Sequence, residues 1–256
     1  MNTVHFIFPV YNEKENLKDL IGGIRQLMAG RSYRMIAVND GSTDGSLSLL
    51  NDLTGDELIV TGSQLNMNVG AAFSTGITAA LAGAADEDAV VIMESDQTSE
   101  QELILPMVQM IFNNEAEIVI ASRYLPGGKY TGFPLPRLVF SHIANRLMRT
   151  FFPVASVLDY TIFFRAYRAG LLRRASTYFG PFGLIQSKGF EANAELLVKL
   201  SLLTKNIREI PFVYDYGNKK GASKIHVLST IKEYFALIGY LRRILARHVL
   251  LKGVKE

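Results

Sequence analysis

The stretch "AVVIMESDQTSE" (Ala89–Glu100) joins an apolar run directly to a pair of carboxylates. Ala89–Met93 has the length and composition of a buried strand. Glu94 and Asp96 follow at once, and two carboxylates this close repel each other and resist burial unless a cation lies between them. The stretch therefore predicts a strand that ends at a divalent cation, Mg²⁺ or Mn²⁺, held by hard oxygen ligands. The simpler alternative is an acidic turn in which Asp96 caps the next helix.

Strands and helices alternate on both sides of this stretch. We predict strands at Thr3–Val10, Tyr33–Asp40, Glu57–Ser63, Ala89–Met93 and Glu117–Ser122. We predict helices at Lys14–Met28, from the turn Gly41–Ser46 to Leu53, at Gly70–Ala84 and at Gln101–Phe112. Such alternation is typical of an α/β fold with a mostly parallel sheet and helices on both faces. Ligands bind beyond the carboxyl ends of the strands in these sheets. Tyr11–Glu13, Asn39–Asp40 and Glu94–Asp96 all follow predicted strands, so we expect them to meet at one site.

The second half of the chain is less regular. We predict a Gly/Pro-rich loop at Pro126–Arg137, an apolar helix at Leu138–Phe152, a strand at Asp159–Arg165, a helix at Phe190–Leu203, a strand at Ile207–Tyr214, a basic loop at Gly217–Lys224 and a long amphipathic helix at His226–Leu251. The two apolar-basic helices have the composition of helices that lie on an anionic lipid surface, although packing on the sheet is the alternative. Because the sequence has no repeat or clear linker, we expect a single domain over residues 1–256.

Composition narrows the function classes. The 256 residues are 48% hydrophobic and 20% charged, which is typical of a globular protein, and the absence of cysteine excludes disulfides, thiolate metal sites and a cysteine nucleophile. The four histidines lack the spacing of a zinc site. Acidic residues gather in the first half and basic residues in the second, a distribution that suits phosphate, nucleic acid or a membrane surface. Without a signal peptide or a spanning apolar run, we expect a cytoplasmic protein, peripheral on the cytoplasmic face of a membrane.

Taken singly, the other motifs are ambiguous. In "FPVYNE", Tyr11 has the ring to stack on a base, and in "VNDGSTDGS" Asp40 has the carboxylate to accept from a base N–H, yet both segments also fit ordinary turns. "NMNVGAAFSTGI" is rich in small residues but lacks the GK[ST] of a P-loop, which argues against that class of NTPase. Its small residues are equally suited to close packing of a helix on a sheet.

The order of the motifs is more specific than any one of them. "FPVYNEKENL", "VNDGSTDGS", "NVGAAFSTGI", "MESDQTSEQ", "ASRY", "DYTIFFRAYR", "GFEANAELL" and "EIPFVYDY" with "KKGASK" follow one another across nearly the whole chain. In this order they resemble the family 2 glycosyltransferases of GT-A fold, and within them the dolichol- or polyprenol-phosphate mannose synthases and their bacterial relatives. The resemblance implies a Rossmann-like GT-A fold with C-terminal amphipathic interface helices.

The resemblance also assigns roles to individual residues. It implies that residues 1–125 bind a nucleotide sugar, and that residues 126–256 bind the acceptor and the membrane. The implied positions are, for the donor, Pro9, Tyr11, Glu13, Asp40 and Asn68; for the metal, Glu94 and Asp96; and for phosphates, Arg123, Arg137 and Ser141. Lys219, Lys220 and Lys224 lie on the basic loop, which such a resemblance places over the phosphates. Asp96, Arg123 and Arg137 are the residues expected to act in catalysis.

Two departures from the family pattern stand out. The usual DxDxQ reads Glu94-Ser95-Asp96-Gln97-Thr98, with a longer first acid and a threonine in place of a metal-binding glutamine. Before the GxSK-like loop the chain has Asn218, followed by Lys219 and Lys220, where an arginine is frequent. A lysine holds a phosphate as a point charge and lacks the two-pronged guanidinium.

The reaction implied is the inverting transfer of a hexose, with GDP-mannose as the favoured donor and a polyisoprenyl phosphate as the acceptor. A UDP-sugar with a lipid or glycan hydroxyl acceptor is the alternative, and it would need Asp159 or Glu191 as a general base. A catalytically silent nucleotide-sugar-binding protein is a further alternative. Nucleic acid is not an expected partner, because no aromatic-basic motif accompanies the positive charge.

Overall fold

A seven-stranded sheet is the centre of the fold. The computed structural model describes residues 2–53, 55–180, 183–218 and 227–253. The strand order is β3-β2-β1-β4-β7-β5-β8, and all neighbouring pairs are parallel except those that involve β7. The strands are β1 (Val4–Val10), β2 (Tyr33–Asp40), β3 (Leu58–Ser63), β4 (Ala89–Ile92), β5 (Ile118–Ser122), β7 (Arg165–Arg168) and β8 (Ile207–Pro211). The five strands predicted in the first half of the chain are confirmed.

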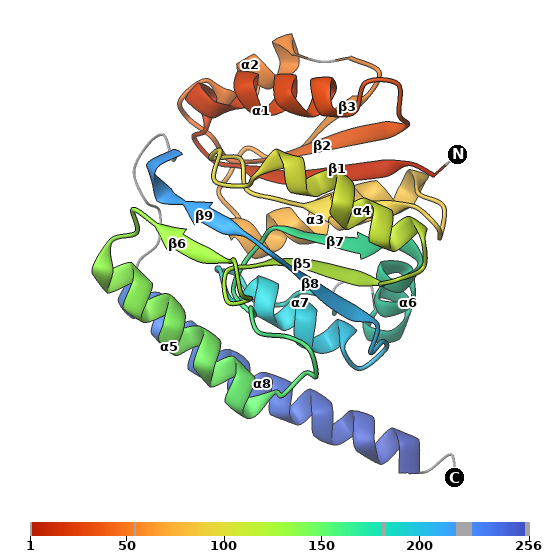
Figure 1. Cartoon of the computed structure of the whole chain (residues 1–256), viewed down its shortest axis with the longest axis vertical. Coiled ribbons are helices and arrows are strands. Elements are labelled where there is room, and N and C mark those ends of the chain that lie inside the picture. Colours follow the sequence, from red (N-terminus) through yellow and green to blue (C-terminus); the bar gives the residue numbers. More distant parts are fainter. Residues whose placement is uncertain (1, 54, 181–182, 219–226, 254–256) are drawn as a thin grey trace.

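Helices cover both faces of the sheet, as predicted (Figure 1). On one face lie α1 (Lys14–Leu27), α2 (Ser46–Asp52) and α4 (Ile104–Phe112), the last preceded by the 3₁₀ turn η1 (Gln101–Leu103). On the other lie α3 (Asn68–Gly83), α6 (Ala169–Phe179) and α7 (Ala192–Leu200). The central strands are therefore buried on both sides, and every residue of β4 and β5 is buried.

The predicted strand at Asp159–Arg165 is wrong. The strand β7 begins only at Arg165, and it runs antiparallel to its neighbours β4 and β5. The Asp159 Oδ1 atom accepts hydrogen bonds from the backbone N–H groups of Thr161 and Ile162, each at 3.1 Å. A carboxylate that binds the amides two and three residues ahead folds the chain into a turn, so this segment cannot extend.

The predicted strand Ile207–Tyr214 is in fact two strands in two sheets. After β8 ends at Pro211, the chain changes partner at Phe212 and continues as β9 (Val213–Asp215), which pairs in parallel with β6 (Lys129–Thr131). At the crossing, the Phe212 N–H donates to the Ser122 carbonyl and the Lys129 N–H donates to the Phe212 carbonyl. The small sheet thus lies beyond the carboxyl edge of the large one, followed by the 3₁₀ turn η2 (Tyr216–Asn218).

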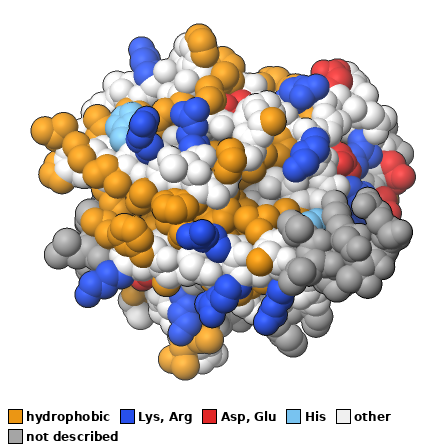
Figure 2. All heavy atoms as spheres, turned by 90° about the horizontal axis from the view of Figure 1, so that it is seen from below, with side chains coloured by type: hydrophobic (Ala, Val, Ile, Leu, Met, Phe, Trp, Pro, Cys, Tyr) orange, Lys and Arg blue, Asp and Glu red, His pale blue; other side chains and the backbone are white. Residues whose placement is uncertain are grey.

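Two helices pack side by side below the sheet. They are α5 (Leu135–Phe151) and α8 (Val227–Gly253), which match the two apolar-basic helices predicted from the sequence (Figure 1). Their outer surface carries exposed apolar side chains surrounded by Lys and Arg (Figure 2). The exposed large apolar residues on it are Leu135, Val139, Ile143 and Phe151 of α5 and Phe235 of α8. Among the described helices, none combines the length and apolarity that crossing a bilayer requires.

Gly70 provides a test of how the site is held in place. A Cβ at this position would lie 1.9 Å from the Ser187 carbonyl oxygen, and the Gly70 N–H donates to the Lys188 carbonyl at 2.9 Å. We expect Gly70→Ala to lower the free energy of unfolding by about 1–3 kcal/mol, the usual range for overpacking. Urea unfolding measures this change.

The matched control is Gly22→Ala. Gly22 lies on an exposed face of α1, and a Cβ there would meet nothing within 4 Å. Since alanine loses less backbone entropy in a helix, this change should raise the free energy of unfolding by roughly 0.5–1 kcal/mol. Equal effects of the two substitutions would contradict the close approach at Gly70.

Candidate active site

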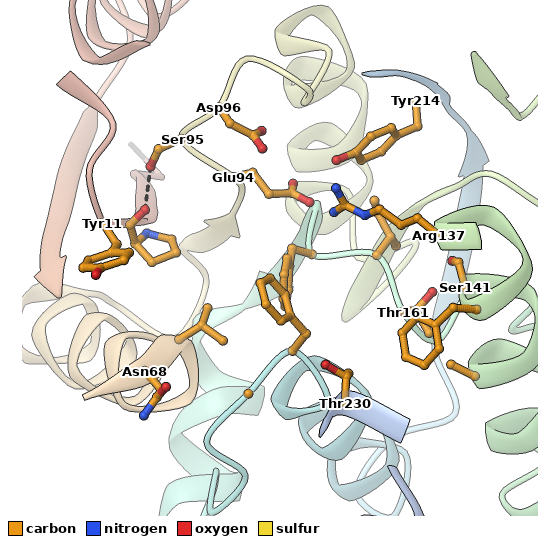
Figure 3. Close-up of a pocket in the computed structure, with 18 of the residues that line it drawn as sticks. Tyr11, Asn68, Glu94, Ser95, Asp96, Arg137, Ser141, Thr161, Tyr214 and Thr230 are labelled. Carbon is orange, nitrogen blue, oxygen red and sulfur yellow. Dashed lines mark hydrogen bonds between the residues drawn. The ribbon is translucent and has the colours of Figure 1, made fainter. Parts of the chain in front are cut away.

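A cavity of ≈ 520 Å³ opens at the carboxyl edge of the sheet. It brings together ten of the predicted site residues: Pro9, Tyr11, Glu13, Asp40, Asn68, Glu94, Asp96, Arg123, Arg137 and Ser141. Figure 3 shows Tyr11 and Asn68 at one end of the cavity, Arg137 and Ser141 at the other, and the acidic residues between them. Lys219, Lys220 and Lys224 lie outside the residues that the structure describes.

At the Tyr11 end, the turns after β1 and β2 are tied together. The Asn12 N–H donates to Ser42 Oγ at 3.1 Å, and the Thr43 N–H donates back to Asn12 Oδ1 at 2.7 Å. Asn12 has a φ of 54°, a left-handed conformation that asparagine tolerates. These bonds set the direction of the chain at Tyr11. The Glu13 carboxylate accepts from Asn16 Nδ2 at 2.7 Å.

Asp40 connects the end of β2 to the start of α3. Its Oδ1 atom accepts from the Met67 N–H at 2.6 Å. Burial raises the pKa of Asp40, and the Met67 and Asn68 N–H groups oppose this by stabilising the charged form. Asn68, with a φ of 71°, follows directly and lines the cavity. Asp40 therefore shapes the loop beside it as well as facing the cavity.

The two carboxylates of the opening stretch lie in the middle of the cavity (Figure 3). Burial, followed by the negative charge of Asp96, raises the pKa of Glu94 to about 7. Ser99 Oγ donates to Glu94 Oε2 at 3.0 Å, and Ser95 Oγ donates to the Pro9 carbonyl at 2.7 Å, which joins this loop to β1. A carboxylate whose ionisation is opposed by a neighbouring acid is an arrangement that a cation would stabilise.

The same donor set can hold a divalent metal ion only together with other oxygen ligands. Within the described part of the chain, no group of three or more His, Cys, Asp or Glu side chains is arranged to hold a metal. Glu94 and Asp96 supply hard oxygen donors, which suit Mg²⁺ or Mn²⁺. These ions commonly complete their coordination with water and substrate phosphates, so the residues present fit a metal that binds together with a diphosphate.

Arg123 is held by a buried ion pair. Its Nε and Nη2 atoms donate to Asp159 Oδ2 and Oδ1, both at 2.7 Å, and Nη2 also donates to Thr161 Oγ1 at 2.7 Å. Burial disfavours the charged form of both side chains. The attraction and the hydrogen bonds between them are stronger than this effect, so the pKa of Asp159 is lowered and the pKa of Arg123 is raised. The guanidinium is thus engaged with Asp159, and any part it has in phosphate binding stays a prediction.

Arg137 lies across the cavity, where its guanidinium points toward Glu94 (Figure 3). It stacks over the rings of Phe133 and Tyr216, each at 5.2 Å from the centroid, and donates to the Tyr216 hydroxyl at 3.3 Å. Stacking on aromatic faces fixes the plane of an arginine, and a guanidinium is the group that binds a phosphate or carboxylate in that plane. Ser141, one turn further along α5, shares a 2.9 Å hydrogen bond with the Tyr130 hydroxyl.

The chain matches the model of a known protein family. The model of "Glycosyl transferase family 2" covers residues 6–177, more than half of the chain. This chain belongs to glycosyltransferase family 2. The family resemblance read from the motifs is therefore confirmed, and with it the expectation of an enzyme.

Among curated relatives, this transferase is similar to enzymes whose names combine mannose with an isoprenoid alcohol or its phosphate. It is 28% identical to the polyprenol monophosphomannose synthase of Mycolicibacterium smegmatis over 222 residues, which are 86% of this chain and 79% of that protein. It is 27% identical to the dolichol-phosphate mannosyltransferase of Pyrococcus furiosus, over 90% of this chain but only 61% of that protein. The undecaprenyl-phosphate mannosyltransferase of Micrococcus luteus is 26% identical over 81% of this chain and 82% of its own.

Solved structures confirm the GT-A-like fold of the transferase. Glucosyl-3-phosphoglycerate synthase from Mycobacterium tuberculosis, in complex with Mn²⁺, UDP and phosphoglyceric acid, superposes with a TM-score of 0.67 over 96% of this chain and 78% of its own. The complex with glucosyl-3-phosphoglycerate, UDP and Mn²⁺ gives 0.66 over 94% and 78%. The sequence identities are 18% and 17%, so the likeness concerns the fold alone.

The structure adds cavity residues that were not among the predicted site residues of the transferase. They are Phe133, Phe140, Thr161, Phe163, Phe190, Tyr214 and Tyr234, all of which line the cavity. Most are aromatic and lie in the irregular second half, where they look like ordinary core residues. The alternation in "PFVYDY" is the one signal that points Tyr214 and Phe212 to the same face.

The raised pKa of Glu94 predicts the direction in which the stability of the folded protein changes with pH. Between pH 4.5, its ordinary pKa, and about 7, the folded state keeps a proton that the unfolded state loses, so folding becomes less favourable as the pH rises through this window. Without metal, we expect Glu94→Gln to raise the melting temperature relative to the wild type at pH 8, and to change it much less at pH 4.5. Calorimetry in chelator-treated buffer measures both values.

The control for this experiment is Glu87→Gln, which alters an exposed carboxyl at the far end of β4. It should leave the difference between the two pH values as in the wild type. A Glu94→Gln protein that is less stable than the wild type at pH 8 would contradict a half-buried, destabilising carboxylate at this position.

Proposed function

We propose that this transferase moves a hexose from a nucleotide sugar, with GDP-mannose the favoured donor, to a polyisoprenyl phosphate. The observation that carries the proposal is a single cavity that runs from the acidic edge of the sheet to the two outer helices. Its lining includes Asp40 and Glu94 at the sheet, Phe140 and Ala144 of α5, and Tyr234 of α8. The names of the three curated relatives support a lipid phosphate as the acceptor.

The donor would occupy the part of the cavity formed by residues 1–125. Tyr11 offers a ring for the base, and the Asp40 carboxylate offers an acceptor for a base or ribose hydrogen. The diphosphate would then lie near Glu94 and Asp96. A bound Mg²⁺ or Mn²⁺ would act there as a Lewis acid that stabilises the charge of the departing diphosphate. Mn²⁺ is present in complexes of the structural neighbour, which supports this choice of metal.

The acceptor would enter from residues 126–256. One oxygen of the lipid phosphate forms a bond to the anomeric carbon, while the bond from that carbon to the diphosphate oxygen breaks and its electron pair leaves with the nucleoside diphosphate. This single displacement inverts the anomeric configuration. The phosphate oxygen is already anionic, so the step needs no general base. It needs a cation to position the phosphate, and Arg137, stacked and facing the acidic pair, has the right geometry.

The alternative reaction, with a hydroxyl acceptor, would need Asp159 or Glu191 as a general base, and the contacts of these two residues argue against it. Asp159 is fully buried and its pKa is lowered by Arg123, so it is a poor proton acceptor near neutral pH. Burial, together with the nearby Glu233, raises the pKa of Glu191, but its Oε1 atom accepts from the Gly189 N–H, and it does not line the cavity. These contacts favour an acceptor that arrives already ionised.

Transfer to lipid is the direct test. Labelled GDP-mannose, and in parallel labelled UDP-glucose, is incubated with a polyprenyl phosphate and Mg²⁺ or Mn²⁺. We expect labelled lipid with GDP-mannose, its loss with EDTA, and a decrease of about 10²–10³-fold in Asp96→Asn, because a charge-stabilising group is removed.

The control is Asp56→Asn, an exposed acid between α2 and β3, which should transfer at the wild-type rate. If the lipid is labelled only from UDP-glucose, the proposed acceptor is correct and the proposed donor is wrong. Hydrolysis without labelled lipid would contradict the acceptor, and nucleotide binding without turnover would favour the silent-binding alternative.

We also propose that the outer face of α5 and α8 lies on an anionic membrane surface. Leu135, Val139 and Ile143 repeat every four residues along α5, so they share one exposed stripe. The exposed cations in the described parts of these two helices are Arg146, Arg149, Lys232, Arg242, Arg243 and Arg247. Apolar side chains surrounded by Lys and Arg are typical of helices that bind the interface of a bilayer. The lipid phosphate would reach Arg137 directly from this surface.

Vesicle binding tests this surface. We expect the wild-type protein to sediment with vesicles that contain anionic lipid, and a Val139→Ser, Ile143→Ser double variant to bind at least about tenfold more weakly, because it loses apolar area from the exposed stripe. Added salt should weaken wild-type binding by screening the cations.

The matched control is Ile59→Ser, an exposed apolar residue on β3, far from α5. It should bind vesicles like the wild type. Equal binding of the double variant and the wild type would contradict the assignment of this face.

A further inference from the structure

Glu191, the residue directly before α7, has a buried carboxylate oxygen that accepts no hydrogen bond. Its Oε1 atom accepts from the Gly189 N–H at 3.2 Å. Its Oε2 atom is shielded from solvent, and no N–H or O–H group in the described part of the chain donates to it. The residue as a whole is only 4% exposed. A buried oxygen without a donor is costly to keep charged, so this position requires a proton or another positive partner.

A second carboxylate lies beside this oxygen. A Cβ on Gly189 would lie 2.6 Å from Glu191 Oε2 and 2.8 Å from Glu233 Oε2, so the two oxygens flank the same point. Glu233 belongs to α8, which packs against α7. Two ionised carboxylates this close repel each other. A single proton between them replaces the repulsion with an O–H···O⁻ hydrogen bond, one of the strong kinds in proteins.

The proton is expected on Glu191, because it is the more deeply buried of the two acids. Glu233 is half-buried and can be solvated when it is charged. Burial raises the pKa of Glu191, and the charge and the side-chain hydrogen bond of Glu233 raise it further. A hydrogen bond that raises the pKa of an acid is one that its protonated form donates. Glu191 Oε2 would therefore donate and Glu233 Oε2 accept.

The charged groups on the elements around α7 have other partners or face solvent. The helix α3 carries no titratable side chain, and Lys188 and Lys232 are exposed. Burial raises the pKa of Tyr234, so its phenol stays neutral. The paired groups are Arg173 with Asp86, Arg174 with Glu117, Tyr178 with His248, Lys199 with Glu195, Arg123 with Asp159, and Arg165 with the Asp159 and Asn193 carbonyls. Among the described residues, no cation pairs with Glu191 in place of the proton.

We propose that Glu191 and Glu233 share a proton and form a pH-sensitive clasp that holds α8 against one wall of the active-site cavity. The pair joins two elements that both line this cavity: the loop with Gly189 and Phe190, and α8 with Thr230 and Tyr234. When the proton is bound, a hydrogen bond connects the elements. When it is lost, two negative charges push them apart. The clasp does not depend on which donor or acceptor binds.

The direction of the pH effect follows from the carboxyl that holds the proton. The clasp is complete at low pH, and it is lost as the pH rises through the raised pKa of Glu191. Each unit by which the pKa is raised corresponds to about tenfold in the equilibrium between the held and the loosened helix.

NMR of the full chain with ¹³C-labelled glutamate carboxyl groups tests whether the proton is shared. The Glu191 signal is assigned by its loss in Glu191→Gln. We expect this signal to titrate above the ordinary range of glutamate in the wild type. Its midpoint should fall by roughly one pH unit in Glu233→Gln, because an amide donor replaces the like charge. Burial also raises the pKa of Glu209, on β8, and the Glu209 midpoint should stay unchanged as an internal reference.

Hydrogen exchange tests the clasp itself. The exchange of residues 230–238 of α8 is measured on each side of the Glu191 midpoint and corrected for the intrinsic effect of pH, with α4 as the reference segment. We expect these amides to exchange about tenfold faster above the midpoint in the wild type. Glu233→Gln should remove this difference, and Glu15→Gln, which alters an exposed carboxyl on α1, should keep it.

Three results would overturn the clasp. The first is a Glu191 signal that titrates in the ordinary range of glutamate. The second is a Glu191 midpoint that does not move in Glu233→Gln, which would show that the two acids do not share a proton. The third is exchange in α8 that depends on pH equally in the wild type and in Glu233→Gln, or in neither.

Discussion

The buried ion pair between Arg123 and Asp159 is the constraint on which the site depends. Asp159 accepts hydrogen bonds from the guanidinium and from the Thr161 and Ile162 amides, so it holds the end of β5 and the loop that lines the cavity. Arg165, fully buried, donates to the carbonyls of Asp159 and Asn193 and thereby joins this loop to α7. Removing one partner of such a pair leaves an unpaired charge and typically costs 3–5 kcal/mol. The floor of the cavity is therefore specified by charge pairing inside the protein.

The acidic edge of the sheet has the opposite character, because its charges are not balanced by the protein alone. Burial and Asp96 keep the pKa of Glu94 near 7, so at neutral pH a proton or a cation must share the site. Arg137, stacked on the rings of Phe133 and Tyr216, lies across the cavity and points toward Glu94. A metal and a diphosphate would supply opposite charges that match this layout. The charges of Arg123 and Asp159 on one side of the cavity are thus paired within the protein, whereas the negative charge of Glu94 and Asp96 must be balanced by bound ligands.

Much of the fold follows from sequence patterns, because the first half of the chain obeys simple rules. β1, β2 and β4 are apolar runs that end at polar turns, and the carboxyl ends of parallel strands must share one edge. This rule predicts that Tyr11, Asp40 and Asp96 meet at one edge of the sheet, and all three line the same cavity. Local pattern was sufficient there because each strand is followed by its own helix.

The second half could not be predicted as well, because its contacts are not local. The sequence offers Asp159 as a possible general base for a hydroxyl acceptor, and only the fold shows that Arg123, distant in sequence, forms an ion pair with it. The same carboxylate bends a segment whose composition predicted a strand. Phe212 turns one predicted strand into two by changing sheets, and the three-residue strand β6 is too short to give a periodic signal. Tyr214 acquires its position from that change of sheet.

A crystal structure with Mn²⁺ and GDP, located by the anomalous scattering of manganese, tests the central claim most directly. The account predicts an anomalous peak in the cavity between Asp96 and the two phosphates, with the base at the Tyr11 end and Arg137 on the opposite side. A manganese peak away from Glu94 and Asp96, or a nucleotide bound outside this cavity, would contradict it.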